Sequence, residues 1–495
     1  MATKQIVKKK APATRKKIPL SASLPAHLTS VREWPKLDVF REGPAALSRK
    51  MVENNFGKAF AAKASERLCQ ALSIVQSYGL ESVASSSPRP TIIECAPPEA
   101  PTSEVRNRAK TLAGAAESVA PALLLLARRH VMRDRFAKYV APFITHLEGQ
   151  SRHNFPAGLE ALASPTVPSS LVEVCWLNGT LRTYVDPRSL SELAHDSAVR
   201  QLDLPRPLLA DIDATGSRVG AAQFRQKFSL TGDHITVAVI DTEVDVNHPA
   251  LAGRVMQKNN YTKERFGNPA PHGTAVAGII GSNDKKFTGM APGVTIGNYK
   301  VLATDASLNS DDFGGSLAIQ QALEDGAQIA NLSWGAGPAS DGTGREAVAC
   351  NTAWGLGLVL VKSAGNRGPG ASSLTTPADA DGIIVVGATD RAGTIVQDYS
   401  SRGPAGTKSR PHLVAPGGTE FDGIHSCLIG GGFGTVGAGT SFAAPHVSGL
   451  AALLLAQNPG LQPDVLRKQL VNLCVKLAAG DANTQGKGFV SLQSL

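Results

Sequence analysis

From about residue 233 onward, short apolar runs alternate with glycine-rich loops and helical segments. The runs are continuous, as expected for strands that are buried on both faces of a sheet. Helical patterns, such as those at 275–280 and 315–326, lie between them. This βαβ alternation predicts an α/β fold with a mainly parallel, doubly wound sheet and helices on both faces. The expected strands lie at 236–240, 329–333, 358–362 and 383–387.

Residues 171–204 show a different pattern. Two β-rich runs, at 172–177 and 180–185, flank Asn178-Gly179, which is a strong hairpin signal. A short amphipathic helix around Leu190 and a strand at 199–204 are expected to follow. This order of strand, hairpin, strand, helix and strand predicts the second half of a small α+β module.

The residue pattern in the region before this module predicts helices. Leu68, Leu72 and Val75 follow helical spacing within a helical stretch at 45–80. A second helical pattern, at 104–147, is interrupted near its two prolines, Pro121 and Pro142.

Serine and proline segments at 85–90 and 97–103 predict a linker between the two helical stretches. No catalytic cluster is visible in this part of the chain. The predicted organisation is a basic disordered tail at 1–30, a helical N-terminal region of unassigned role at 31–150, the α+β module at 151–210 and the α/β domain at 231–495.

The formal charge of +9 is concentrated at the start of the chain, where no acidic residue precedes Glu33. A solvated tail and a contact with nucleic acid or another polyanion both fit this pattern. No aromatic residue interleaves the cations, so base stacking is not expected. The cations that would make such a contact are Lys8, Lys9, Lys10, Arg15, Lys16 and Lys17.

The six cysteines are scattered, with neither a disulfide pattern nor zinc-ligand spacing, which fits a reducing compartment. No apolar segment follows the basic N-terminus, so no secretory signal is expected. The apolar run at 119–127 is too short to span a bilayer. We therefore expect a soluble, cytoplasmic protein without membrane contact.

Ser441 follows a glycine-rich approach and opens an apolar helical run at 447–456. The first N–H groups of a helix have no partner within the helix and can stabilise a negative oxygen that forms beside such a serine. For a serine in isolation, a simple helix N-cap is the alternative interpretation.

Two upstream residues could activate this serine. Asp241 ends a predicted buried strand, where open α/β sheets place their sites, and His272 opens a helix. An imidazole can remove the proton of a serine hydroxyl, and a carboxylate on its far nitrogen fixes the tautomer. For an isolated histidine, a capping or core role is the alternative.

The chain resembles the subtilisin-like serine proteases, the subtilase or S8 peptidase family. The resemblance covers roughly residues 230–477, and its motifs follow the family's order, with the catalytic residues in the order Asp, His, Ser. The Gly-Thr-Ser-x-Ala context differs from the Gly-x-Ser-x-Gly elbow of α/β-hydrolases. The matching segments are VIDT at 239–242, HPAL at 248–251, HGTAVAG at 272–278, MAP at 290–292, LSWG at 332–335, SAGN at 363–366, YSSRGP at 399–404, APG at 415–417 and GTSFAAP at 439–445.

The resemblance implies a role for each matching residue. Ser441 would be the nucleophile, His272 the general base and then acid, and Asp241 the residue that orients the histidine. Asn366 would donate to the oxyanion together with the Ser441 N–H. Loss of one such donor costs on the order of a hundred- to thousandfold in rate, a magnitude measured on subtilisin itself. The alternative for Asn366 is a left-handed turn residue.

The resemblance also implies that Ser333, Trp334 and Gly335 pair with the substrate backbone by β-addition. For Trp334, a core aromatic is the alternative. The α+β module at 151–210 resembles the end of a subtilase propeptide, which assists folding and inhibits the enzyme as in a zymogen. Residues 205–230 would then be either a processed junction or a permanent linker.

Two departures from the family pattern stand out. Glu243 replaces the glycine that usually follows Asp-Thr, and its side chain would alter the turn. The loop between Gly278 and Gly289 is shorter than the calcium-binding loop of secreted subtilisins. Asn283 and Asp284 are too few oxygen ligands for calcium, so we expect no metal and no cofactor.

The leading hypothesis is an intracellular serine endopeptidase that acts on proteins or peptides through an acyl-enzyme and is regulated by its N-terminal region. An alternative is an interaction or regulatory module whose tail and helices bind a partner or nucleic acid, with proteolysis gated or secondary. A third is a protease held inactive by residues 30–205 until an activating protein partner arrives.

Overall fold

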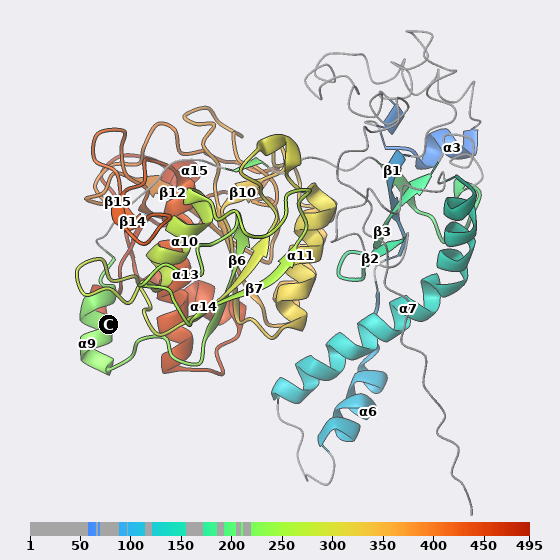
Figure 1. Cartoon of the computed structure of the whole chain (residues 1–495), viewed down its shortest axis with the longest axis horizontal. Coiled ribbons are helices and arrows are strands. Elements are labelled where there is room, and N and C mark those ends of the chain that lie inside the picture. Colours follow the sequence, from blue (N-terminus) through green and yellow to red (C-terminus); the bar gives the residue numbers. More distant parts are fainter. Residues whose placement is uncertain are drawn as a thin grey trace, which may run out of the picture.

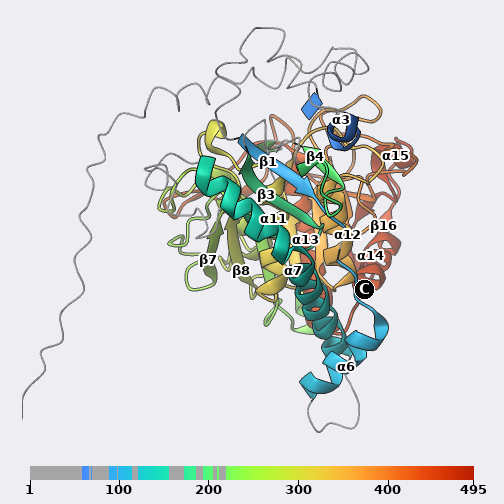
Figure 2. The same cartoon turned by 90° about the vertical axis from the view of Figure 1, so that its right-hand side faces the viewer.

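The computed structural model contains a large α/β body and a smaller N-terminal module beside it (Figure 1). Both bodies contain a sheet and helices, and the module packs against one side of the larger body (Figure 2). The structure describes residues 58–65, 68–69, 89–96, 98–113, 121–154, 172–185, 193–203, 209–210 and 219–495.

A nine-stranded sheet forms the centre of the large body, in the order β16-β17-β13-β12-β11-β9-β6-β8-β7. Neighbouring strands are parallel except for the antiparallel edge pair of β16 and β17. The predicted α/β fold with a mainly parallel sheet is therefore confirmed. The strands are β6 (Thr236–Asp241), β7 (Val255–Asn260), β8 (Thr295–Lys300), β9 (Ile329–Leu332), β11 (Val359–Ser363), β12 (Ile384–Thr389), β13 (Leu413–Pro416), β16 (Cys474–Val475) and β17 (Phe489–Val490).

Helices cover both faces of this sheet. Helices α11 (Asp312–Glu324) and α12 (Arg345–Gly355) lie on one side, and α10 (Pro271–Gly281) and α13 (Thr440–Gln457) lie on the other (Figure 1). Every residue of β9, β11 and β12 is buried, which explains why their sequences are mainly apolar rather than alternating.

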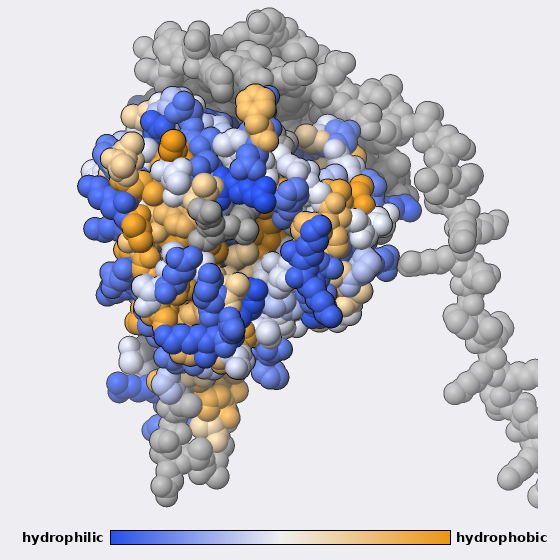
Figure 3. Space-filling model, turned by 90° about the vertical axis from the view of Figure 1, so that its left-hand side faces the viewer, coloured by the Kyte–Doolittle hydropathy of each residue, from blue (hydrophilic) through white to orange (hydrophobic). Residues whose placement is uncertain are grey.

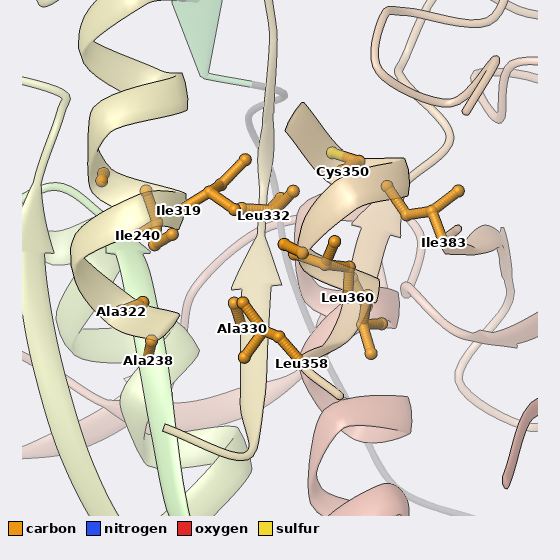
Figure 4. Close-up of a cluster of buried hydrophobic side chains, with 14 of the residues drawn as sticks. Ala238, Ile240, Ile319, Ala322, Ala330, Leu332, Cys350, Leu358, Leu360 and Ile383 are labelled. Carbon is orange, nitrogen blue, oxygen red and sulfur yellow. The ribbon is translucent and has the colours of Figure 1, made fainter. Parts of the chain in front are cut away.

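The core between α11, α12 and the sheet is built from interlocking aliphatic side chains. Ile319 and Ala322 from α11 face Ile240 and Leu332 from the strands (Figure 4). Cys350 from α12 belongs to the same buried cluster. This packing holds the ends of β6 and β9 in fixed positions, and the chain leaves the sheet toward the candidate site from these ends.

Shorter elements complete the large body. On the face shown in Figure 3, hydrophilic and hydrophobic side chains are interspersed, as is usual for exposed protein surface. Two helices of the body are α9 (Ala221–Phe228) and α14 (Pro463–Asn472), and the hairpin before α13 is formed by β14 (His425–Cys427) and β15 (Phe433–Thr435).

The N-terminal module contains a four-stranded antiparallel sheet in the order β2-β3-β1-β4. The predicted hairpin at Asn178-Gly179 is confirmed, with Gly179 at a φ of 72° in the turn. The predicted strand at 199–204 is present as a shorter one. The strands are β1 (Arg89–Glu94), β2 (Glu173–Cys175), β3 (Thr180–Val185) and β4 (Gln201–Asp203).

Strand β1 was not predicted, because its residues lie where serine and proline indicate a linker. Its partners are the distant strands β3 and β4, and these pairings determine its conformation. The sheet of the module therefore draws a strand from the stretch at 31–150 as well as strands from 151–210.

Helices α6 (Thr102–Ala113) and α7 (Pro121–Asn154) form an antiparallel pair beside this sheet. The break expected near Pro121 is confirmed, since α7 begins there. The break expected near position 142 is wrong, because α7 continues to Asn154. A proline removes one backbone hydrogen bond and its ring crowds the carbonyl four residues earlier, but the contacts of α7 with α6 and β3 support the helix.

Other predictions about this region lie mostly outside the described residues. Of the helical stretch predicted at 45–80, the structure describes helix α3 (Lys58–Lys63) and the helical residues 68–69. The tail at 1–30 and the helix expected around Leu190 fall outside the described ranges. Among the residues that are described, no helix is both long and apolar enough to cross a membrane.

Candidate active site

Asp241 and His272 are in direct contact. Asp241 is the last residue of β6 and is fully buried, and His272 is the second residue of α10. His272 Nδ1 lies 2.7 Å from Asp241 Oδ1. A carboxylate only accepts hydrogen bonds, so Nδ1 is the donor and Nε2 is the nitrogen that can take up a proton. The N-cap of α10 is Ala270, so His272 does not cap this helix.

The glycine after His272 explains how the two residues come together. The Gly273 N–H donates to Thr242 Oγ1 at 2.8 Å, which places the first turn of α10 against the chain that leaves β6. A Cβ on Gly273 would lie 2.5 Å from Thr242 O, so a larger residue would push the helix away. The His-Gly-Thr motif therefore requires glycine for this close approach.

Ser441 is the second residue of α13 and is fully buried. Its hydroxyl donates to Ser333 O at 3.3 Å, and Ser333 Oγ donates to Ser441 O at 2.6 Å. The next residue, Phe442, has its ring centroid 5.1 Å from that of His272, so the first turn of α13 lies beside the imidazole. Because Gly439 is the N-cap of α13, the alternative of Ser441 as an N-cap is wrong.

Asn366 lies close to the same turn. Its Oδ1 accepts hydrogen bonds from Thr440 N and Thr440 Oγ1, both at 2.9 Å. These two donors fix which end of the carboxamide is the oxygen, one residue away from Ser441. The left-handed conformation at this turn belongs to Gly365, with a φ of 107°, and Asn366 is not among the residues with positive φ, so the turn-residue alternative is wrong.

Trp334 and Gly335 form β10, the strand predicted to bind substrate. Strand β5 (Leu209–Ala210) pairs antiparallel with it, Ala210 opposite Trp334 and Leu209 opposite Gly335. The Trp334 side chain is fully buried, as in the core-aromatic alternative, while its backbone lies at this paired edge. A segment of the chain's own N-terminal part thus occupies the edge where a substrate strand is expected.

The short loop after α10 is held by its own side chains. Asp284 Oδ1 accepts from the Lys286 and Phe287 N–H groups, both at 2.8 Å. The Phe287 ring stacks on Phe433 of β15, with centroids 4.7 Å apart. Within the described ranges, no group of three or more His, Cys, Asp or Glu side chains is placed to hold a metal ion.

The predicted triad residues therefore gather at the C-terminal end of β6 and the N-terminal ends of α10 and α13, and Asn366 lies beside the last of these. Their catalytic roles remain predictions. Sequence reasoning missed Thr440, which binds the Asn366 oxygen. It also missed where the Glu243 side chain points. Thr440 adjoins Ser441 in the Gly-Thr-Ser motif, but nothing in the motif indicates a partner that is 74 residues away.

Comparison with known proteins identifies relatives for this part of the chain. The family model described as "Subtilase family" matches residues 232–488. Serine protease AprX of Bacillus subtilis (strain 168) is 31% identical over 344 residues, covering 63% of this chain and 77% of that protein.

Subtilisin BL of Lederbergia lenta is 34% identical over 286 residues, covering 56% of this chain and 96% of its own length. A solved structure, "S41 Psychrophilic Protease", aligns over 57% of this chain and 100% of that chain with a TM-score of 0.47 and 28% identity.

Proposed function

The chain belongs to the subtilase family of serine peptidases, and we propose that its α/β domain at 231–495 is an endopeptidase that works through Asp241, His272 and Ser441. As a subtilisin-like serine peptidase it is a hydrolase that acts on protein or peptide substrates. The observation that carries the assignment of these residues is the 2.7 Å contact of His272 Nδ1 with Asp241 beside the first turn of α13.

In this proposal His272 Nε2 takes the proton of the Ser441 hydroxyl as Oγ attacks the scissile carbonyl carbon. Asp241, on Nδ1, stabilises the imidazolium that forms. The Asn366 amide and the Ser441 N–H donate to the tetrahedral oxyanion. The C–N bond then breaks, His272 gives its proton to the leaving amine, and an acyl-enzyme remains on Ser441. Water, deprotonated by His272, hydrolyses this ester in the second half of the cycle.

The proposal is tested by treating the full-length protein with a fluorophosphonate probe and measuring its intact mass, with peptide hydrolysis measured in parallel. We expect one adduct at Ser441, and loss of both labelling and hydrolysis in Ser441→Ala. Ser448→Ala, on the same helix, is the matched control and should still be labelled. Hydrolysis that persists unchanged in Ser441→Ala would contradict the assignment.

We also propose that the N-terminal module holds the peptidase in an inhibited, zymogen-like state. Arg129 of α7 supports this, because it donates to Leu323 O at 3.1 Å and to Leu356 O at 2.8 Å, at the C-terminal ends of α11 and α12. A cation at these helix ends is favourable. Arg182 of β3 reaches the other end of α11, with Nη1 2.7 Å from both carboxylate oxygens of Asp311.

Arg345, the first residue of α12, is buried and connects the two bodies through charge pairs. Its Nη1 lies 3.0 Å from Glu94 Oε1 and 2.6 Å from Asp203 Oδ2, both in the module. Its Nη2 lies 2.9 Å from Asp312 Oδ2 of α11. Release of the module would break the contacts of Arg345 with Glu94 and Asp203. A hydrogen bond to a charged group typically contributes about 1.5–3 kcal/mol, so these contacts oppose release.

A partner that displaces the module would activate the enzyme in this scheme. The tail cations Lys8 to Lys10 and Arg15 to Lys17, which lie outside the described residues, are proposed to contact a polyanion. Deletion of residues 1–20 should weaken heparin binding, and unchanged binding would contradict that contact.

We propose a cytoplasmic location. It is supported by the cysteines, since none of the six, all of which the structure describes, forms a disulfide.

A further inference from the structure

Glu243 follows Asp241 by two residues and occupies a position where the family pattern has glycine. We propose that Glu243 is a positioning residue for His272: its buried carboxylate, together with Lys300, fixes the loop at 261–270 that leads into α10. The inference rests on the proposed roles of Asp241 and His272. It concerns what holds the general base in place rather than the chemistry of the base itself.

Glu243 holds this loop with both its side chain and its main chain. The carboxylate is buried, with the residue 3% exposed, and accepts from Gly267 N at 2.7 Å and from Asn268 N at 3.3 Å. The Glu243 main-chain oxygen accepts from Ala270 N at 2.9 Å. Ala270 is the N-cap of α10, two residues before His272. Glu243, two residues after β6, therefore binds three residues of the segment that leads to His272.

Lys300 provides the positive charge that allows Glu243 to be buried. It is fully buried at the end of β8, where it is paired in register with Asp241 of β6. Its Nζ lies 3.0 Å from Glu243 Oε2, 2.8 Å from Glu264 Oε2 and 3.0 Å from Arg265 O. The ammonium thus binds Glu243 on one side and the loop on the other.

Glu264 closes the loop on its outer side. It accepts from Asn268 Nδ2 at 2.9 Å and from Thr304 N at 3.2 Å, and also from the Thr304 hydroxyl. Partial burial opposes its charged form, but the hydrogen bonds from Lys300, Thr304 and Asn268 lower the pKa of Glu264 to about 2. If Glu243 is neutralised, Glu264 therefore remains as the counter-ion of Lys300.

We expect the loss of Glu243 to change the position of His272 more than the stability of the fold. Strand β6 is buried among apolar neighbours, so the loss of Glu243 contacts leaves the sheet intact and releases chiefly the loop. A displacement of about 1 Å at a catalytic group can lower the rate on the order of a hundredfold. We therefore expect the loss to appear in kcat and in the reactivity of Ser441, rather than in KM.

The test compares full-length wild type with Glu243→Gln and Glu243→Gly. The measurements are kcat, KM, the rate constant of fluorophosphonate labelling and the melting temperature. Gln retains an acceptor for Gly267 N, so we expect roughly a tenfold loss of kcat and of labelling rate; for Gly, which removes every side-chain contact, the expected loss is on the order of a hundredfold. KM should change less than about twofold, as expected for an interaction that acts only in the transition state.

Ile319→Val is the matched control for lost stability, because Ile319 is buried between α11 and the sheet (Figure 4). It should lower the melting temperature without changing the labelling rate. Amide hydrogen exchange is a readout independent of activity, and exchange at Gly267 and Asn268 should be faster in Glu243→Gly than in Ile319→Val.

The outcomes are distinguishable. Wild-type labelling rates in both Glu243 variants, or a loss confined to KM or to the melting temperature, would overturn the positioning role. If Ser441 is labelled neither in wild type nor in Arg182→Ala, which loosens the docking of the N-terminal module, the proposed function fails. In that case the exchange data decide about Glu243: unchanged exchange at Gly267 and Asn268 overturns the inference, and faster exchange supports it.

Discussion

At the scale of single residues, the site depends on short polar contacts between segments that are distant in sequence. Asn366 is an example, because its oxygen is bound to Thr440, next to Ser441. With the oxygen committed there, the NH2 end of the amide is the end that can donate to an oxyanion. This orientation is fixed before any substrate arrives, which is what preorganised stabilisation requires.

Asn366→Asp isolates the donor, because Asp retains an oxygen for Thr440 but replaces the NH2 group with a second oxygen. We expect kcat to fall on the order of a hundred- to thousandfold with little change in KM, a magnitude known from the corresponding loss in subtilisin itself. Steady-state kinetics on a peptide substrate measure this. The control is Asn351→Ala, which should retain activity. Asn351 lies on α12, where its side chain accepts a hydrogen bond from Gly382 N. A comparable kcat in Asn366→Asp would remove Asn366 from the mechanism.

The sequence motifs point to Asp241, His272, Ser441 and Asn366, because each lies in a segment whose residues are characteristic by themselves. They do not indicate the partners that orient these residues. Thr440 binds Asn366 across 74 positions and Lys300 binds Glu243 across 57. Such pairs depend on which strand ends become neighbours, and a single sequence carries no local pattern for that.

At the scale of elements, strands β6, β9, β11 and β12 were predictable, because helices on both faces of the sheet require mainly apolar sequences. Strand β1 was not, since its conformation comes from pairing with distant strands rather than from its own residues. The uninterrupted course of α7 through position 142 has the same origin, because tertiary contacts outweigh the local preference of a proline.

Packing of α13 on α10 gives a prediction at this scale. A Cβ on Gly449 of α13 would lie 2.3 Å from the Met290 Cβ, in the segment that follows α10. Gly449→Ala should therefore destabilise the protein by about 1–3 kcal/mol, as overpacking of a tight core does. Urea denaturation of the full-length protein measures the change.

Gly355 is the matched helical glycine, because nothing lies within 4 Å of its added Cβ. Gly355→Ala should be neutral or stabilising by up to about 1 kcal/mol, since alanine has the higher helix propensity. Equal effects of the two substitutions would mean that the contact of Gly449 with Met290 does not limit the packing of α13.

At the scale of the whole molecule, the N-terminal module lies across α11 and α12 (Figure 2). Its arginines contact the termini of these helices, where aligned backbone groups carry partial charges. The surface they cover is separate from the candidate triad, which lies at the ends of β6, α10 and α13. Inhibition by the N-terminal part of the chain would therefore depend on β5, which pairs with β10 at the edge where substrate is expected.

Arg182→Ala should loosen this docking, because it removes both contacts with Asp311. A hydrogen bond to a charged group typically contributes about 1.5–3 kcal/mol, so we expect labelling of Ser441 to become about tenfold faster or more. Arg108→Ala is the control, since Arg108 pairs with Asp134 within the α6 and α7 hairpin, at 2.6 Å. If wild type and both variants react at one rate, the module does not gate the site.

The pairing of β5 with β10 has a consequence for competition. Both strands belong to one chain, so β5 competes for this edge at an effective concentration set by the connecting chain rather than by the concentration of the protein. A free peptide must match that concentration or bind more tightly. Dilution of the protein leaves this competition unchanged. Severing the chain between β5 and α9 converts it into an ordinary bimolecular equilibrium, which dilution shifts toward an open edge.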